Sequence, residues 1–174
     1  YTVATRMENI LMIPIIGIQN TMATFAGQNM GARQPERVSK GLGQGVLVSV
    51  LMTAALCLCQ LLGMELIIRA FKLDAAAAAI CRQHLFASVL SEPIFAIYFP
   101  ANGMFQGVGE GFHATFYALM ALGLRVVFAY SLYRTAFFGY TAIWWSQAMA
   151  WTLTLVTCYA HFFHGKWKEK SLVS

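Results

Sequence analysis

A single carboxylate, Glu92, stands deep within an apolar part of the sequence and is the strongest candidate for ion chemistry. Pro93 and Pro100 follow it, and each proline lacks the amide hydrogen that would bond the carbonyl four residues earlier, that of Val89 or Ala96. A charge at the centre of a bilayer costs about 2.5–3.5 kcal/mol on insertion scales, so such a carboxylate normally faces a cavity or a partner. Glu92 therefore either couples transport to a cation or a substrate, or forms a structural ion pair.

Two arginines are candidate partners for Glu92. Arg82 follows Asp74 by only eight residues, so its side chain is expected to reach the membrane interface, whereas Arg125 lies deeper. The residues that we expect at a cation-coupling or substrate cavity are Glu92, Arg125, Gln19, Asn20, Tyr98 and Asn102. For the three amides, hydrogen bonding between helices is the simpler role, and for Tyr98 core packing is simpler than stacking on a cationic substrate.

Catalytic and metal chemistry find little support in the pattern of residues. Cys57 and Cys59 are two positions apart and point about 200° apart around a helix, so they cannot share a metal ion. The other ionisable residues show no spacing such as His-x-x-x-His, and the loop at 107–111 lacks the Lys-Ser/Thr of a phosphate-binding loop. We expect no catalytic residue and no metal ligand, with an integral membrane enzyme as an open alternative.

Long uncharged stretches must position these side chains. A bilayer core of about 30 Å needs roughly 20 apolar residues of helix. Hydrophobic residues make up 59% of the chain, charged residues 11%, and the mean hydropathy is +0.61, which excludes an ordinary soluble domain. The net charge of +5 comes mostly from residues that flank apolar runs, so a nucleic-acid partner is not expected. The uncharged stretches of membrane-spanning length cover residues 9–32, 41–64, 93–109 and 135–160.

The pattern predicts an all-α, polytopic membrane protein with five spans. Asp74 is a good N-cap for the alanine run that follows it. The expected helices cover about residues 2–30, 38–70, 74–103, 112–133 and 137–163.

Basic residues predict the orientation, because cytoplasmic loops attract lysine and arginine. One side of the membrane would hold Arg33, Arg37, Lys40, Lys166, Lys168 and Lys170, and the other Arg6, Arg69, Lys72 and Arg134. This bias places the first turn and the C-terminal tail in the cytoplasm and the N-terminal residue outside. The start at Tyr1 without an initiator methionine fits a fragment that lacks an odd number of upstream helices.

Two glycine-bearing motifs add a family resemblance. Residues 14–40 read PIIGIQNTMATFAGQNMGARQPERVSK, and residues 102–109 read NGMFQGVG. The first resembles the Gly-Gln-x-x-Gly-Ala turn and Arg-bearing loop of the multidrug and toxic compound extrusion (MATE) family, and the second resembles that family's later glycine turn. Gly27 and Gly31 would form a small-xxx-small face, and Gln28 and Asn29 would cap carbonyls. The matching residues are Gly27, Gln28, Asn29, Gly31, Ala32, Arg33, Glu36, Arg37, Gly103, Gly107 and Gly109.

The resemblance implies a twelve-helix exporter built from two six-helix lobes, of which residues 1–174 would be the last five helices of the C-terminal lobe. Such a protein lies in the plasma (inner) membrane and exports organic or cationic compounds in exchange for Na⁺ or H⁺ by alternating access, without another cofactor. Its implied partners are the lipid bilayer, small organic substrates and the missing N-terminal lobe. A flippase for lipid-linked saccharides stays open as an alternative, although its cavity should be rich in basic residues and only Arg125 qualifies.

Overall fold

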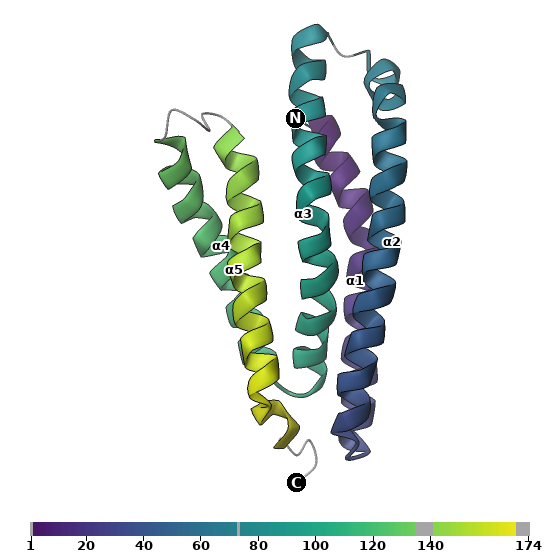
Figure 1. Cartoon of the computed structure of the whole chain (residues 1–174), viewed down its shortest axis with the longest axis vertical. Helices are drawn as coiled ribbons and strands as arrows, with labels where there is room; N and C mark the ends of the chain where they lie inside the picture. Colours follow the sequence, from purple (N-terminus) through teal and green to yellow (C-terminus); the bar gives the residue numbers. More distant parts are fainter. Residues whose placement is uncertain (1, 73, 135–140, 170–174) are drawn as a thin grey trace.

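The structure, a computed structural model, describes residues 2–72, 74–134 and 141–169. These ranges form five long α-helices and one short 3₁₀-helix, which confirms the predicted all-α architecture (Figure 1). The elements are α1 (Thr2–Gly31), α2 (Pro35–Ala70), α3 (Ala75–Gly107), α4 (Gly111–Tyr133), α5 (Ala142–His164) and η2 (Lys166–Glu169).

Two helix boundaries differ from the predicted ones. Helix α2 begins at Pro35 and not at residue 38, because proline fits the first turn of a helix, where its missing amide hydrogen has no partner to lose. Helix α3 continues to Gly107, so the predicted end at residue 103 is wrong. The predicted start of the last helix at residue 137 lies outside the described residues, and α5 is described from Ala142.

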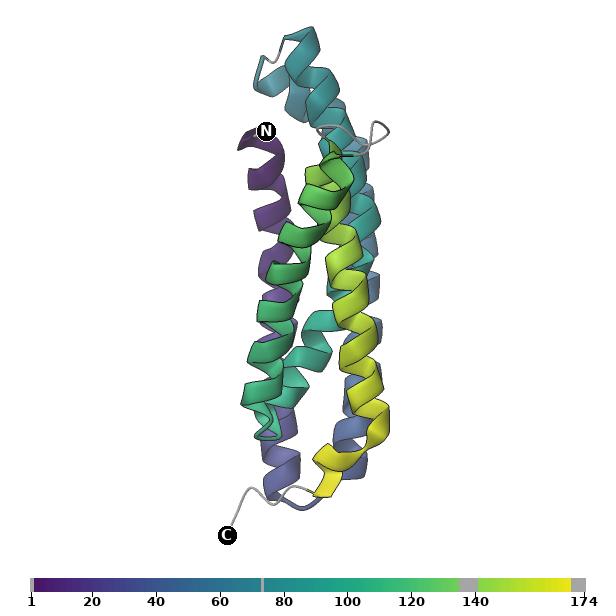
Figure 2. The ribbon, with the colours of Figure 1, turned by 90° about the vertical axis from the view of Figure 1, so that its left-hand side faces the viewer.

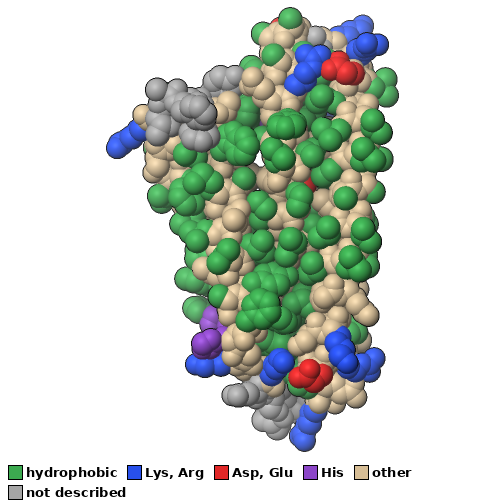
Figure 3. All heavy atoms as spheres, viewed as in Figure 1, with side chains coloured by type: hydrophobic (Ala, Val, Ile, Leu, Met, Phe, Trp, Pro, Cys, Tyr) green, Lys and Arg blue, Asp and Glu red, His purple; other side chains and the backbone are tan. Residues whose placement is uncertain are grey.

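The surface and the helix lengths agree with a polytopic membrane protein. Within the described residues, α2, α3, α4 and the part of α1 from Glu8 to Gly31 are long and apolar enough to cross a bilayer. Helix α5 has 23 residues and runs antiparallel along α4 (Figure 1). That α5 also crosses the membrane stays a prediction. Apolar side chains cover the middle of the face in Figure 3, while lysines, arginines and acids gather at its two ends.

Helix α3 is the centre of the bundle. It packs against α1, α2 and α5, and α4 and α5 form an antiparallel pair beside this group (Figures 1 and 2). The second half of α3 turns away from the line of the first half in Figure 2, in the part that carries Pro93 and Pro100. Proline removes a backbone hydrogen bond and is the usual cause of such a bend. The main core lies in this second half, around Tyr98, Met104 and Phe105.

Glycines set the close contact between α1 and α3. A Cβ atom at Gly103 would lie 2.1 Å from the carbonyl oxygen of Gln19, and one at Gly107 would lie 2.1 Å from that of Ala23. Gly27 also faces this contact, since its Cβ would lie 3.3 Å from the Gly107 oxygen. No atom lies within 4 Å of the corresponding point at Gly31, so the predicted Gly27/Gly31 packing face is wrong. The small-xxx-small pair is Gly103 and Gly107, inside a helix and not in a turn.

The turns follow the local sequence. Arg33 adopts a φ of 57° after α1, and the amide of Gln34 donates to the Asn29 carbonyl at 2.8 Å. The Asn29 side chain donates to the carbonyl of Phe25 at 2.8 Å, one turn back within α1, so it does not reach the carbonyls at the helix end that the capping hypothesis expects it to bond. Gly109 has a φ of 81°, which glycine adopts without strain.

The predicted N-cap and the predicted grouping of basic ends are both present. Asp74 caps α3 by accepting from the amide of Ala77 at 2.7 Å, as expected. At the opposite end of the bundle, Lys168 pairs with Glu36 at 3.3 Å. This contact places η2 and the α1–α2 turn on the same side of the bundle, and Lys170 of the predicted basic group lies outside the described residues.

Candidate functional site

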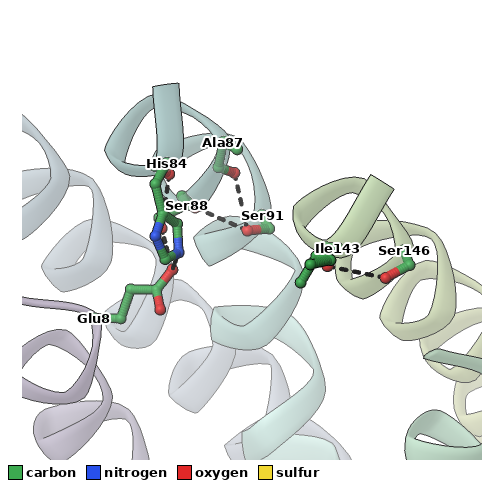
Figure 4. Close-up of polar contacts among 7 residues, drawn as sticks. All are labelled: Glu8, His84, Ala87, Ser88, Ser91, Ile143 and Ser146. Carbon is green, nitrogen blue, oxygen red and sulfur yellow. Dashed lines mark hydrogen bonds and ion pairs between the residues drawn. The ribbon is translucent and has the colours of Figure 1, made fainter. Parts of the chain in front are cut away.

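An acid–imidazole pair between the half-buried Glu8 and the buried His84 joins α1 to α3. The Oε1 atom of Glu8 lies 3.0 Å from Nε2 of His84, and the hydroxyl of Ser88 donates to the same carboxylate oxygen (Figure 4). Ser88 also contacts the carbonyl of His84 at 3.1 Å, and these two residues lie one helical turn apart on α3. Residues four apart share one face of a helix, so the local sequence itself aims both side chains at Glu8.

The surroundings of this pair are polar and confined. The His84 ring stacks on Trp144 of α5 with centroids 5.0 Å apart, which fixes its orientation. The positive charge of Arg125 from α4 acts favourably on the Glu8 carboxylate. A cavity of about 20 Å³ lies beside the pair, and a volume of that size holds roughly one water molecule. Its lining residues are Glu8, His84, Ala87, Ser88, Ser91, Arg125, Trp144 and Gln147.

Glu92 lies one turn further along α3 and is almost completely buried, with 2% of its surface exposed. Its Oε2 atom has no hydrogen-bond partner among the described residues, and it experiences the negative charge of Glu8. Arg82 is not the partner of Glu92, one of the two candidate pairs, because it binds Glu65 through two hydrogen bonds of 2.8 and 3.0 Å near the helix ends. Within the described ranges, Glu92 also forms no ion pair with Arg125. The Arg125 side chain instead lines the cavity beside Glu8.

A buried polar stripe on α2 adds to the surroundings of Glu92. Ser49, Thr53 and Gln60 are buried at helical spacing, together with Cys57, whose sulfur experiences the charge of Glu92. The polar side-chain atoms of Ser49, Thr53 and Gln60 have no hydrogen-bond partner in the part of the chain that the structure describes. Buried polar groups are normally paired, so this stripe and Glu92 form an unsatisfied polar region inside the bundle.

Asn102 is the centre of a second polar network. Its Oδ1 atom accepts from Gln19 at 2.9 Å and from Gln106 at 2.8 Å. Its amide nitrogen contacts the Tyr98 hydroxyl at 2.8 Å and donates to the carbonyl of Ala114 at 2.9 Å. The network joins α1, α3 and α4, so interhelical hydrogen bonding is the observed role of Gln19 and Asn102. Tyr98 is 1% exposed and packs edge-on against Phe99 and Trp151, in agreement with the expected core role.

Asn20 does not join either network. It lies on the exposed face of α1, where Thr24 and Gln28 follow at intervals of four residues. Residues four apart lie above one another on a helix, so these three side chains form one polar stripe, which we call the α1 polar stripe. A polar stripe on a membrane-spanning helix normally faces another helix or a water-filled cavity instead of lipid.

Residues from two helices meet at the start of α4. Glu110, His113 and His161 each offer one ligand-type atom, and these atoms lie within 4.8 Å of one another. Spacing along the sequence predicts no metal ligand here, because spacing relates residues of one helix. Glu110 and His113 lie at the start of α4, whereas His161 belongs to α5.

Glu8 was missed by the sequence analysis, which placed the first apolar run after it. The available signal was the spacing of His84 and Ser88, since two polar side chains on one face of an apolar helix need a polar partner. The identity of that partner depends on which helix lies opposite, and the sequence does not contain this information locally.

Comparison with known proteins gives the family. Residues 1–131 match the MatE family model, a range that holds both glycine motifs, Glu8, His84, Glu92 and Arg125. Searches of curated proteins and of solved structures found no match. A family match over this share of the chain, on a bundle of long apolar helices, shows that the chain belongs to the MatE family of membrane transporters.

Proposed function

We propose that the protein is a secondary active exporter, which moves organic, often cationic or amphipathic compounds across the plasma membrane in exchange for inward H⁺ or Na⁺. The observation that carries this proposal is the acid region formed by the buried Glu92 and His84 and the half-buried Glu8. Ionisable groups inside a membrane protein are costly, and they typically mark ion pathways and proton relays.

The size and chemistry of this region suit a small cation and not a drug molecule. A cavity of about 20 Å³ accommodates roughly one water molecule, whereas ligand pockets for organic compounds measure about 300–1,000 Å³. An imidazole 3.0 Å from a carboxylate exchanges protons readily, so His84 and Glu8 favour H⁺ over Na⁺ as the coupling ion.

The α1 polar stripe supports a separate path for the organic substrate. Asn20, Thr24 and Gln28 lie on the exposed face of α1, where a second lobe would complete a central cavity. An apolar groove of about 280 Å³ lies between α1 and α2, lined on α1 by residues outside the stripe. We therefore propose that this chain works with a second helical lobe, and that the two lobes rock against each other around the shared cavity.

A flippase for lipid-linked saccharides fits these residues less well. Its cavity needs several basic side chains to face a pyrophosphate, whereas Arg125 acts on the Glu8 carboxylate.

The test is the substitution Glu92→Gln in the full-length protein, which keeps the shape of the side chain and removes its charge. We expect ion-driven efflux of a fluorescent organic cation from proteoliposomes to fall at least tenfold, with a normal amount of folded protein. Glu65→Gln is the matched control, since that carboxylate lies in an exposed pair near a helix end and should leave efflux unchanged.

Two results would contradict the proposal. Normal efflux in Glu92→Gln would remove the coupling role of this residue, and loss of folded protein in parallel with activity would indicate a structural one. Imposing a pH gradient or a Na⁺ gradient separately across the same vesicles identifies the ion.

A further inference from the structure

Three side chains meet at the end of the bundle where α4 begins and α5 ends. Glu110 and His113 lie three residues apart on the first turn of α4, and His161 lies in the last turn of α5. Residues three apart share one helix face, so Glu110 and His113 project together toward α5. Their ligand-type atoms and that of His161 lie within 4.8 Å of one another.

The contacts within the cluster hold the side chains in place. Glu110 stands at the N-cap of α4, yet its carboxylate does not cap the helix and instead contacts Nδ1 of His113. The carboxylate is buried, whereas the His113 side chain is 44% exposed and gives access from solvent. The two imidazole rings have their centroids 4.7 Å apart.

Neighbouring residues orient His161. Its Nδ1 atom lies 2.7 Å from the Tyr117 hydroxyl, and its ring stacks on Phe105 with centroids 4.8 Å apart. A histidine that binds a metal through one ring nitrogen usually has its other nitrogen in a hydrogen bond, which fixes the tautomer and the direction of the ligand. In a metal site at this cluster, Nδ1 of His161 would keep its contact with Tyr117 and Nε2 would serve as the ligand atom.

We infer that Glu110, His113 and His161 form a binding site for a divalent transition-metal ion of the Zn²⁺ type. Two imidazoles and one carboxylate are a donor set that Zn²⁺ accepts, with a fourth position left for water. The bound ion would link the start of α4 to the end of α5. This site is formed by α4 and α5, whereas Glu8 and Glu92 belong to α1 and α3. The inference is therefore independent of the proposed coupling role.

The test is metal binding to the purified, metal-depleted protein in detergent. Titration with Zn²⁺ in a calorimeter should show one tight site per chain, and Co²⁺ should give the visible absorption of tetrahedral coordination. Zn²⁺ should also raise the thermal unfolding temperature, because it links two helices.

Variants separate this site from adventitious binding. His113→Ala and His161→Ala should each weaken Zn²⁺ binding by more than about 100-fold, and Tyr117→Phe by about 10–100-fold through loss of the orienting hydrogen bond. His164→Ala is the matched control, since His164 lies in the same last turn of α5 but outside the cluster, and it should bind Zn²⁺ like the unaltered protein. His113→Gln provides a second variant that keeps the polarity of the position, with the circular dichroism spectrum as a check of folding.

Absence of a stoichiometric site would overturn the inference. Equal loss of binding in His164→Ala and His113→Ala would do the same, because it would show nonspecific binding to surface histidines. Neither result bears on Glu92-dependent efflux, so the two proposals fail separately.

Discussion

The close contact between α1 and α3 gives a prediction whose size follows from the structure. In Gly107→Ala, the new Cβ atom would lie 2.1 Å from the carbonyl oxygen of Ala23 and 2.9 Å from the Cβ atom of Ala26. Neither neighbour has a flexible side chain that can rotate away. Raising the shorter distance from 2.1 Å to the 3.4 Å of ordinary contact requires the two helices to separate by about 1.3 Å.

The expected cost is the difference between two effects. Overpacking of this kind typically costs about 1–3 kcal/mol, whereas alanine in place of glycine inside a helix gains about 0.5–1 kcal/mol. We therefore expect Gly107→Ala to lower the free energy of unfolding by up to about 2.5 kcal/mol, with a central value of about 1 kcal/mol. Reversible unfolding of the purified protein in detergent, followed by circular dichroism, measures the change.

Gly43→Ala is the control for this prediction. Gly43 also lies inside a helix, but no atom lies within 4 Å of its would-be Cβ, so the substitution should be neutral or slightly stabilising. If Gly107→Ala were as stable as Gly43→Ala, the close approach of α1 and α3 at this position would be refuted.

Two further predictions concern the Asn102 network and the orientation of the chain. Asn102→Leu should leave the buried Tyr98 hydroxyl and the half-buried Gln19 amide without their Asn102 partner, and an unpaired buried polar group costs about 1–3 kcal/mol. Thermal unfolding should therefore shift downward, whereas Asn20→Leu on the exposed face of α1 should not shift it; equal shifts would contradict a structural role for the network. In a background without the four native cysteines, an impermeant maleimide added to intact cells should label Lys72→Cys and not Gln34→Cys, and the reverse pattern would place the C-terminal tail outside.

The sequence by itself determines that this chain is a helical membrane protein of the MatE type. The apolar runs are long enough to span a bilayer as helices. They must be helical there, because unpaired backbone amides are too costly in lipid. The same local information predicted the Asp74 cap of α3. It also singled out Glu92, because an acid in an apolar run stands out wherever the helix is placed.

The tertiary structure decided which side chains meet. The partner of His84 is Glu8, 76 positions away, and the partner of Arg82 is Glu65 and not Glu92. Such pairings depend on how each helix is rotated about its axis and on the height at which neighbours cross, and no residue spacing encodes these quantities. The glycines show the same limit, because GxxxG is visible in the sequence but the contact surface is visible only once α1 lies on α3. A Cβ atom at Gly107 would meet the Ala23 carbonyl, whereas one at Gly31 would meet no neighbouring atom within 4 Å.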